Sequence, residues 1–235
     1  MKLTFVYSYY ENPNTLDYLF NQWKKYDEDV LKNIEFIITD DCSKKFPLKN
    51  INKPEELNIR YFEIQQKVDW NWLACRNVGA FHSKGKWLLI TDIDHFVRHD
   101  NIKVLHKKIK YISEEYVYML ERRNLSDKRI NNHGNSFLMT REMYWKIGGY
   151  DETLSGRYSG TTMAYKKRIL WNTKGLKLVE IPLHCISDND IDDSQTIELS
   201  RNKNMKDLEF CKRVINNKGR VIRVLTFPYQ EVKCG

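Results

Sequence analysis

Short apolar runs alternate with amphipathic stretches through residues 1–95. The apolar runs are rich in β-branched and aromatic side chains, which favours buried strands, and they occupy residues 3–7, 34–39, 59–64 and 87–91. Between them, residues 14–26 and 71–83 place apolar side chains at helical spacing. Strands that alternate with helices in this way predict a parallel sheet covered by helices.

The remainder of the chain has a less regular pattern. We expect strands at residues 116–120, 136–140, 176–182 and 219–227. We expect helices at residues 102–113, 141–147, 161–172 and 194–216, the last of them long and polar. No internal repeat, low-complexity tract or linker rich in Pro, Gly or Ser divides the sequence. We therefore predict one domain over residues 1–235, made of a first half (1–95), a second half (96–193) and a C-terminal helix and strand (194–235).

Composition and cysteine spacing narrow the class of protein. Hydrophobic residues make up 41% and aromatic residues 13% of the chain, which is enough to fill a core. No run of 18 apolar residues occurs, so we expect no transmembrane helix, and we expect residues 1–10 to form a strand and not a signal peptide. The five cysteines lack CxxC spacing, which argues against a zinc site or disulfide framework. We therefore expect a cytoplasmic protein with no integral membrane segment.

Acidic residues follow two of the expected strands. Asp40 and Asp41 come after the second apolar run, and Asp92 and Asp94 come after the fourth. In open α/β sheets, ligands bind beyond the carboxyl ends of the strands. Two carboxylates two residues apart at a strand end can approach one hard cation such as Mn²⁺ or Mg²⁺. A pair of solvated loop aspartates would have the same spacing.

Several motifs occur in a fixed order along the chain. They are Asp40-Asp41-Cys42-Ser43, Arg76-Asn77-Val78-Gly79, Asp92-Ile93-Asp94 and Gly148-Gly149-Tyr150-Asp151-Glu152. In this order they resemble the GT-A glycosyltransferases, especially the family-2-like group, over roughly residues 1–185. The resemblance implies an α/β fold with a Rossmann-like central mixed sheet flanked by helices. It also implies a metal-dependent hexosyl- or pentosyltransferase that moves a sugar from a nucleotide-diphosphate sugar to an acceptor hydroxyl.

The resemblance implies a role for each donor-side residue. Asp40 or Asp41 would contact the uracil or ribose of the donor, with a UDP-sugar as the favoured donor, and Ser8 would lie near the same nucleotide. Tyr9 could stack on the base, as could the tyrosine that follows it, although both could equally line the wall of the loop. Arg76 could bind the diphosphate bidentately or form a surface ion pair.

The same resemblance implies a site for Mn²⁺ or Mg²⁺. Asp92 would face the ribose or the metal, and Asp94 would be the main metal ligand. His184 follows an expected strand, and a late histidine supplies a further ligand in several GT-A families. His95 adjoins the Asp-x-Asp motif and is a weaker candidate. Either histidine could instead be a satisfied core or loop residue.

The general base is the point where the sequence departs from the family. Family members usually carry an acidic pair after the Gly-Gly-aromatic-Asp segment, but residues 159–163 read Ser-Gly-Thr-Thr-Met. We predict Asp151 or Glu152 as the base, with Asp151 preferred. Asp151 could instead cap the following helix. The acidic run 188–193, a retaining mechanism without this base, and a catalytically inactive relative stay open as alternatives.

The basic charge bears on the acceptor. The formal net charge is +8, and residues 98–131 hold nine Lys or Arg against five Asp or Glu. Such clusters suit a phosphate-rich acceptor if they share a face, so a hydroxymethylated base in viral or phage DNA stands beside a carbohydrate or glycolipid acceptor. Two other classes of function compete. One is a non-catalytic nucleotide-sugar- or glycan-binding module on the same fold, and the other is a DNA-binding protein without activity.

Overall fold

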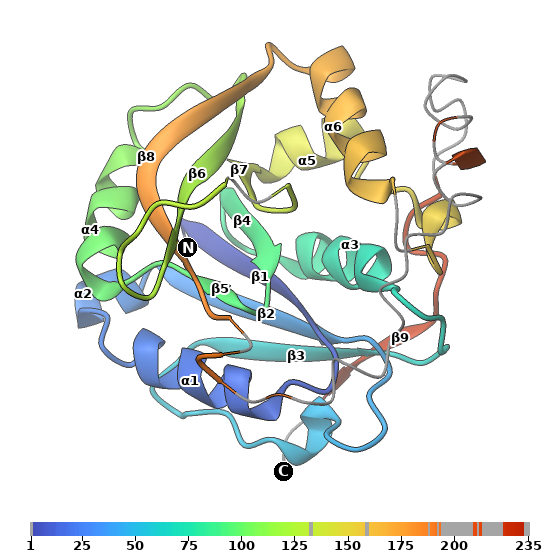
Figure 1. Ribbon diagram of the computed structural model, residues 1–235, viewed down its shortest axis with the longest axis horizontal. Helices are drawn as coiled ribbons and strands as arrows, with labels where there is room; N and C mark the ends of the chain where they lie inside the picture. Colours follow the sequence, from blue (N-terminus) through green and yellow to red (C-terminus); the bar gives the residue numbers. More distant parts are fainter. Residues whose placement is uncertain are drawn as a thin grey trace.

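A single mixed sheet runs through the computed structural model, which describes residues 2–131, 134–157, 160–187, 189–191, 193, 209, 210, 212 and 223–232 (Figure 1). The strands lie in the order β5-β8-β6-β7-β4-β1-β2-β3-β9. Their bounds are β1 Leu3–Tyr9, β2 Ile34–Asp40, β3 Ile59–Ile64, β4 Trp87–Asp92, β5 His95–Phe96, β6 Val117–Asn124, β7 Phe137–Thr140, β8 Leu176–Cys185 and β9 Tyr229–Val232.

Helices connect most of these strands. Their bounds are α1 Pro13–Trp23, α2 Glu28–Leu31, α3 Trp72–His82, α4 His99–Lys108, α5 Arg141–Ile147 and α6 Thr161–Asn172, with single 3₁₀ turns η1 at Leu48–Asn50 and η2 at Glu152–Leu154. Among the described residues, none of the helices is long and apolar enough to cross a membrane.

The centre of the sheet is parallel. Strands β4, β1, β2 and β3 pair in parallel. At the two sides of this group, β7 pairs antiparallel with β4, and β9 pairs antiparallel with β3. Every residue of β2 is buried, because helices cover both faces of this part of the sheet. This explains why the central strands appear in the sequence as continuous apolar runs instead of alternating ones.

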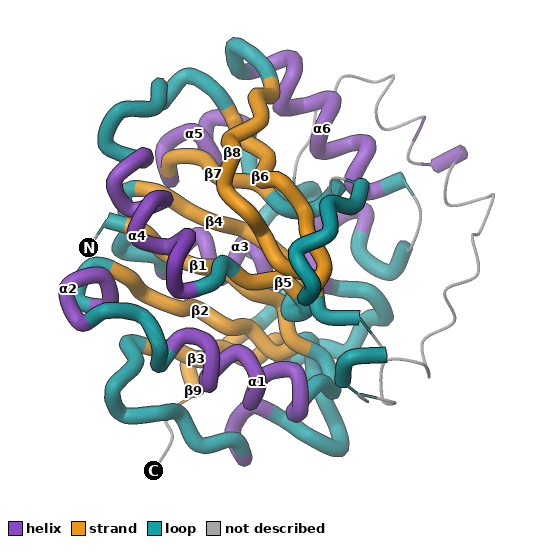
Figure 2. The backbone as a smooth tube through the Cα atoms, turned by 60° about the vertical axis from the view of Figure 1, so that its left-hand side comes forward, coloured by secondary structure: helices purple, strands orange, loops and turns teal. Residues whose placement is uncertain are grey.

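Alternate side chains of β1 enter different layers of the core. Phe5 and Tyr7 pack with α1 and α4, and Val6 packs with α3, α5 and α6, so the sheet lies between two layers of helices (Figures 1 and 2). Gly79 sets the separation on the α3 side. A Cβ at this position would lie 2.5 Å from Val6 Cγ1, so only glycine lets α3 lie this close to β1.

The observed elements agree closely with the pattern-based expectations for the chain up to residue 185. The strand expected at residues 219–227 is wrong over residues 223–227, which contain no strand, and residues 219–222 lie outside the described residues. Strand β9 begins at Tyr229 instead. Glu152 accepts hydrogen bonds from the backbone N–H groups of Leu225 and Thr226, which therefore do not pair in the sheet. The short elements α2 and β5 were not predicted, because so few residues carry no periodic signal. The helix expected at 194–216 lies almost wholly outside the described residues.

Candidate functional site

Four predicted site residues lie at one edge of the sheet. Strand register pairs Ser8 with Asp92 and Tyr9 with Asp40, at the carboxyl ends of β1, β2 and β4. Because these strands are parallel neighbours, their ends meet where an open α/β sheet binds its ligands. The structure thus brings the donor-side candidates together.

Asp40 shapes a loop at this edge. Its Oδ1 accepts from Ser43 N at 2.9 Å, and its Oδ2 accepts from Leu48 N at 2.9 Å. Burial raises the pKa of Asp40 to about 6, although these hydrogen bonds favour its charged form. Both carboxylate oxygens are therefore engaged in holding residues 41–48.

Asp41 has a spare carboxylate oxygen. Its Oδ2 accepts from Asn71 N at 2.9 Å, whereas its Oδ1 is buried and has no hydrogen-bond partner among the described residues. Burial raises the pKa of Asp41 to about 8, and the charge of Lys67 opposes that rise. The side-chain amide of Asn71 and the Nζ of Lys67 are likewise buried without a hydrogen bond from the described chain, although Nζ lies 4.0 Å from Asp69 Oδ1. Such atoms are costly unless a ligand or water satisfies them.

The two tyrosines after Ser8 have different surroundings. Tyr9 is buried and its hydroxyl donates to Phe46 O at 2.7 Å, so it forms part of the loop wall. Tyr10 is partly exposed, and Lys67 Nζ lies 3.8 Å from the centre of its ring. Tyr10, more than Tyr9, therefore borders the buried polar atoms around Asp41.

Arg76 is fully buried on α3 and connects the two halves of the sheet. Its Nη1 donates to Asn135 O at 2.8 Å and to the Tyr150 hydroxyl at 2.9 Å, and its Nη2 forms an ion pair with Asp92. The guanidinium also lies 4.5 Å from the ring centre of Trp72. These contacts differ from the surface ion pair considered for Arg76, and they fix the carboxylate of Asp92 in place.

Asp94 lies just beyond β4 with its side chain 43% exposed. Its backbone carbonyl accepts from Ile186 N at 2.8 Å, which ties it to the segment after β8. His95 Nδ1 lies 2.6 Å from Asp94 Oδ1, and Arg122 Nε donates to His95 Nε2 at 2.9 Å. The ligand atoms of Asp94, His95 and Cys185 lie within 4.8 Å of one another. Sequence reasoning missed Arg122 and Cys185, because nothing in their local patterns places them beside Asp94.

His184 has other partners. Its Nε2 lies 2.7 Å from Asp127 Oδ1, and Asp127 Oδ2 also accepts from Arg98 Nη1 at 2.7 Å. Successive residues of a strand point to opposite faces of the sheet. Cys185 is the β8 residue that pairs with His95, so the adjacent His184 points to the other face. Among the described residues, His184 does not join Asp92 and Asp94 in a group whose ligand atoms lie within 4.8 Å of one another.

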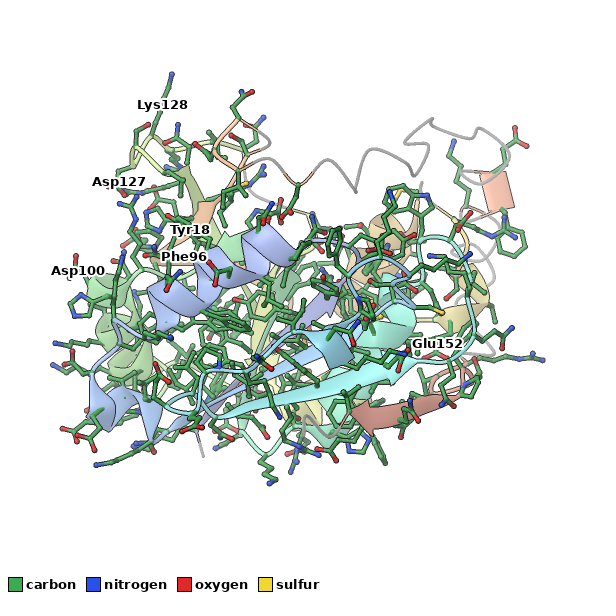
Figure 3. The ribbon with its side chains drawn as sticks, turned by 90° about the horizontal axis from the view of Figure 1, so that it is seen from below. Tyr18, Phe96, Asp100, Asp127, Lys128 and Glu152 are labelled. Atoms are coloured by element: carbon green, nitrogen blue, oxygen red, sulfur yellow. The ribbon has the colours of Figure 1, made fainter. Side chains whose placement is uncertain are left out.

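The two predicted base residues are buried. Asp151 caps η2: its Oδ1 accepts from Thr153 N at 3.1 Å and from the Thr153 hydroxyl at 2.8 Å. Glu152 accepts from Asn77 Nδ2 at 2.7 Å through Oε1, and from Thr226 N at 2.7 Å through Oε2. In Figure 3, Asp127 lies at the upper left of the view and Glu152 to the right of its centre.

Asn77 belongs to the Arg-Asn motif but was not among the predicted site residues. Its Nδ2 also donates to Tyr150 O at 2.8 Å, and its Oδ1 accepts from Tyr150 N at 2.8 Å and from the Tyr144 hydroxyl. Gly149 adopts φ +63, where a Cβ would lie 2.8 Å from Asn77 Oδ1. The two motifs are therefore one packed unit that joins α3 to the Gly-Gly-Tyr-Asp-Glu segment.

The acidic run 188–193 is only partly described. Asp193 accepts from the backbone N–H groups of Asn14 at 3.2 Å and Thr15 at 2.7 Å, at the start of α1. Asp190 accepts from Ser187 N at 2.8 Å. Asp188 and Asp192 lie outside the described residues.

Comparison with known proteins identifies the family. The model of the family described as "Glycosyl transferase family 2" matches residues 5–173, which is more than half of the chain. The chain belongs to glycosyl transferase family 2. An uncharacterized glycosyltransferase of Haemophilus influenzae (strain ATCC 51907 / DSM 11121 / KW20 / Rd) is 28% identical over 150 residues, covering 54% of this chain and 50% of the relative. The chain thus spans about half the length of that curated relative.

Solved structures of family-like enzymes confirm the GT-A fold. The chain is similar to S. aureus TarS 1–349 in complex with UDP-GlcNAc, with a TM-score of 0.74 and 13% identity over 95% of this chain and 68% of that chain. It is also similar to the mannosyltransferase PcManGT from Pyrobaculum calidifontis in complex with GDP-Man and Mn²⁺. For PcManGT the TM-score is 0.59 and the identity 13%, over 78% of this chain and 56% of that one.

Proposed function

We propose that this chain is a glycosyltransferase that moves a sugar from a nucleotide-diphosphate sugar, preferably a UDP-sugar, to an acceptor hydroxyl. One observation carries the proposal: buried polar atoms without partners in the described chain lie at the same sheet edge as the exposed carboxylates of the Asp-x-Asp motif. Family membership supplies the reaction class, and the edge supplies a place for its donor.

The polar atoms around Asp41 suit a nucleotide base. Asn71 offers a donor and an acceptor from one amide, as the edge of a uracil requires, and Asp41 Oδ1 offers a further polar contact. Tyr10 gives an aromatic face beside them, and the Lys67 ammonium lies against that face. Ser8 is in register with Asp92, which supports a role for Ser8 beside the nucleotide.

The residues at the end of β4 fit a divalent cation. Asp92 and Asp94 are 30% and 43% exposed and offer carboxylate oxygens, the ligands that Mg²⁺ and Mn²⁺ prefer. We propose that these two residues hold the ion and that His184 stays with Asp127. When bound, the ion offsets the negative charge that develops on the departing diphosphate. Arg76 holds the Asp92 carboxylate in position for the ion.

The base is proposed on the acceptor side. All hydrogen bonds described for Asp151 reach Oδ1, whereas both oxygens of Glu152 accept. We therefore keep Asp151 ahead of Glu152 as the residue that takes the proton of the acceptor hydroxyl.

A carbohydrate or glycolipid acceptor is favoured over DNA. Some basic residues of the second half do not face solvent. Arg122, in the basic segment 98–131, donates to His95 and Cys185, and Arg168 on α6 is buried and donates to Ile147 O. A DNA-binding face needs such side chains free to reach phosphates. Because these two arginines donate hydrogen bonds within the protein, they are not available to bind DNA phosphates, and a DNA acceptor has less support.

The proposal is tested with a panel of UDP, GDP and CMP sugars, each screened by thermal shift with and without Mn²⁺. A ligand that binds only the folded state raises the melting temperature, by an amount that grows with the logarithm of its concentration relative to its Kd. We expect the largest Mn²⁺-dependent shift with a UDP-sugar, followed by slow hydrolysis of that donor. A shift without hydrolysis would favour the non-catalytic module, and no shift with any donor would overturn the proposal.

A further inference from the structure

We propose that Asp94, His95 and Cys185 form a binding site for a thiophilic divalent cation such as Zn²⁺. The site shares Asp94 with the donor cation, so zinc would compete with that cation. Only this consequence rests on the proposed function, and the site itself rests on the geometry of the described residues.

The backbone fixes the spacing of the three ligands. Strand pairing places His95 directly opposite Cys185, and Ile186 N donates to Asp94 O at 2.8 Å, which holds the flanking residues in register. The three ligand atoms lie within 4.8 Å of one another. Ligand atoms of a tetrahedral zinc ion lie about 3.3–3.8 Å apart, given bonds of about 2.0–2.3 Å. Side-chain rotations, together with withdrawal of the Arg122 guanidinium from His95 and Cys185, would bring the three atoms around one ion.

The donor set selects the metal. A thiolate, an imidazole and a carboxylate match the ligands of zinc, whereas Mg²⁺ and Mn²⁺ favour oxygen ligands over thiolate. His95 and Cys185 are buried, and the Asp94 side chain is 43% exposed. The two softer ligands thus form the floor of the site, and the carboxylate side gives the ion its entry and a fourth position for water.

Arg122 already places a cation at the same ligands. Its Nε donates to His95 Nε2 at 2.9 Å and its Nη2 donates to Cys185 Sγ at 3.0 Å. Both atoms are therefore presented as acceptors to one positive group. Zinc binding requires Cys185 to release its proton to solvent and His95 to exchange a hydrogen bond for the metal, against the charge of Arg122. Arg122 should accordingly weaken zinc affinity, and its removal should strengthen it.

Zinc at this site would act on the donor through Asp94. The carboxylate that ligates zinc is no longer available to the ion that accompanies the diphosphate. Low concentrations of Zn²⁺ should therefore raise the Mn²⁺ concentration needed for donor binding, and this effect should depend on Cys185, which the donor site itself does not use.

The direct test is a Co²⁺ titration of the metal-free full chain followed by absorbance spectroscopy, without any nucleotide sugar. Cobalt bound to a thiolate in tetrahedral geometry gives a sulfur-to-metal charge-transfer band and an intense visible band. We expect both bands to saturate at one equivalent, to vanish on addition of Zn²⁺ and to be absent in Cys185→Ser. Cys75→Ser, which removes another buried free thiol, should keep them. Absent bands in the unmodified protein, or bands that persist in Cys185→Ser, would overturn the site.

Two further variants keep the test decisive if Cys185→Ser folds poorly. Asp94→Asn should lower Zn²⁺ affinity about tenfold or more, as measured by competition with a chromogenic chelator, and Arg122→Met should raise it by a similar factor. Unchanged zinc affinity in both variants would contradict the site. Because none of these measurements uses a donor, failure here leaves the donor thermal shifts untouched, and failure of those shifts leaves the zinc result standing.

Discussion

The donor edge and the Gly-Gly-Tyr-Asp-Glu segment use buried acids in opposite ways. At the donor edge, Asp41 keeps an oxygen with no hydrogen bond from the described chain, and Asp94 is exposed. In the second region, Glu152 has both oxygens bonded to α3 and to residues 225–226. A buried carboxylate with an oxygen that accepts no hydrogen bond indicates a ligand site. A buried carboxylate whose oxygens both accept hydrogen bonds indicates a connection between secondary-structure elements. The same contrast separates Asp41 from its neighbour Asp40, which is fully engaged in its loop.

Arg76 joins the two regions, so its removal should have the largest effect. Arg76→Met leaves Asp92 without its ion pair and Tyr150 without a donor. Removing one partner of a buried charged pair costs about 3–5 kcal/mol, and the partial exposure of Asp92 places the expected loss near the lower value. Urea denaturation measures it. Arg129→Met, on an exposed residue, should change the free energy of unfolding by less than about 1 kcal/mol. Similar losses in both variants would contradict the linking role.

Glu152 should matter mainly for stability. Glu152→Ala leaves the buried Asn77 amide and two backbone N–H groups without their acceptor, at an expected cost of about 2–4 kcal/mol. Chemical denaturation and sugar-transfer rates, measured on the same preparation, separate a structural role of Glu152 from a role as general base. A lost rate with unchanged stability would instead make Glu152 the base and remove the contrast with the donor edge.

Asp41 should give the unfolding free energy a pH dependence. Its pKa is raised to about 8 when folded, so the folded state keeps a proton that the unfolded chain releases near pH 4. The contribution of Asp41 to stability is therefore fully present below pH 4 and declines as the pH rises from 4 to 8, by up to about 1.4 kcal/mol per pH unit. Asp40, raised to about 6, has the same sign at lower pH. Between pH 6 and 8, the unmodified protein should lose stability and Asp41→Asn should not; parallel curves would refute this assignment.

Lys67 should affect the donor more than the fold. Lys67→Met removes a cation beside Asp41 and Tyr10, and we expect about tenfold weaker UDP binding in calorimetry with little change in melting temperature. Lys166→Met, on α6, should leave UDP affinity unchanged. Equal UDP affinities for the unmodified protein, Lys67→Met and Lys166→Met would mean that the uracil of UDP binds elsewhere.

Local pattern predicts the donor half well and the second half less well. Buried parallel strands give continuous apolar runs, so β1 to β4 and their terminal acids were found from sequence, and α5 and α6 agree with the expected bounds. Contacts between distant segments leave no such signal. The pairing of β5 with β8, which brings Cys185 to His95, and the hydrogen bonds from residues 225–226 to Glu152 depend on tertiary packing alone.

Calorimetric titration of UDP with and without Mn²⁺ tests the central claim most directly. If the ion is held by the Asp-x-Asp motif, Mn²⁺ should tighten UDP binding at least tenfold in the unmodified protein and leave it unchanged in Asp94→Asn. Asp100→Asn, on an exposed aspartate of α4, should behave like the unmodified protein (Figure 3). An undiminished effect of Mn²⁺ in Asp94→Asn would contradict the account.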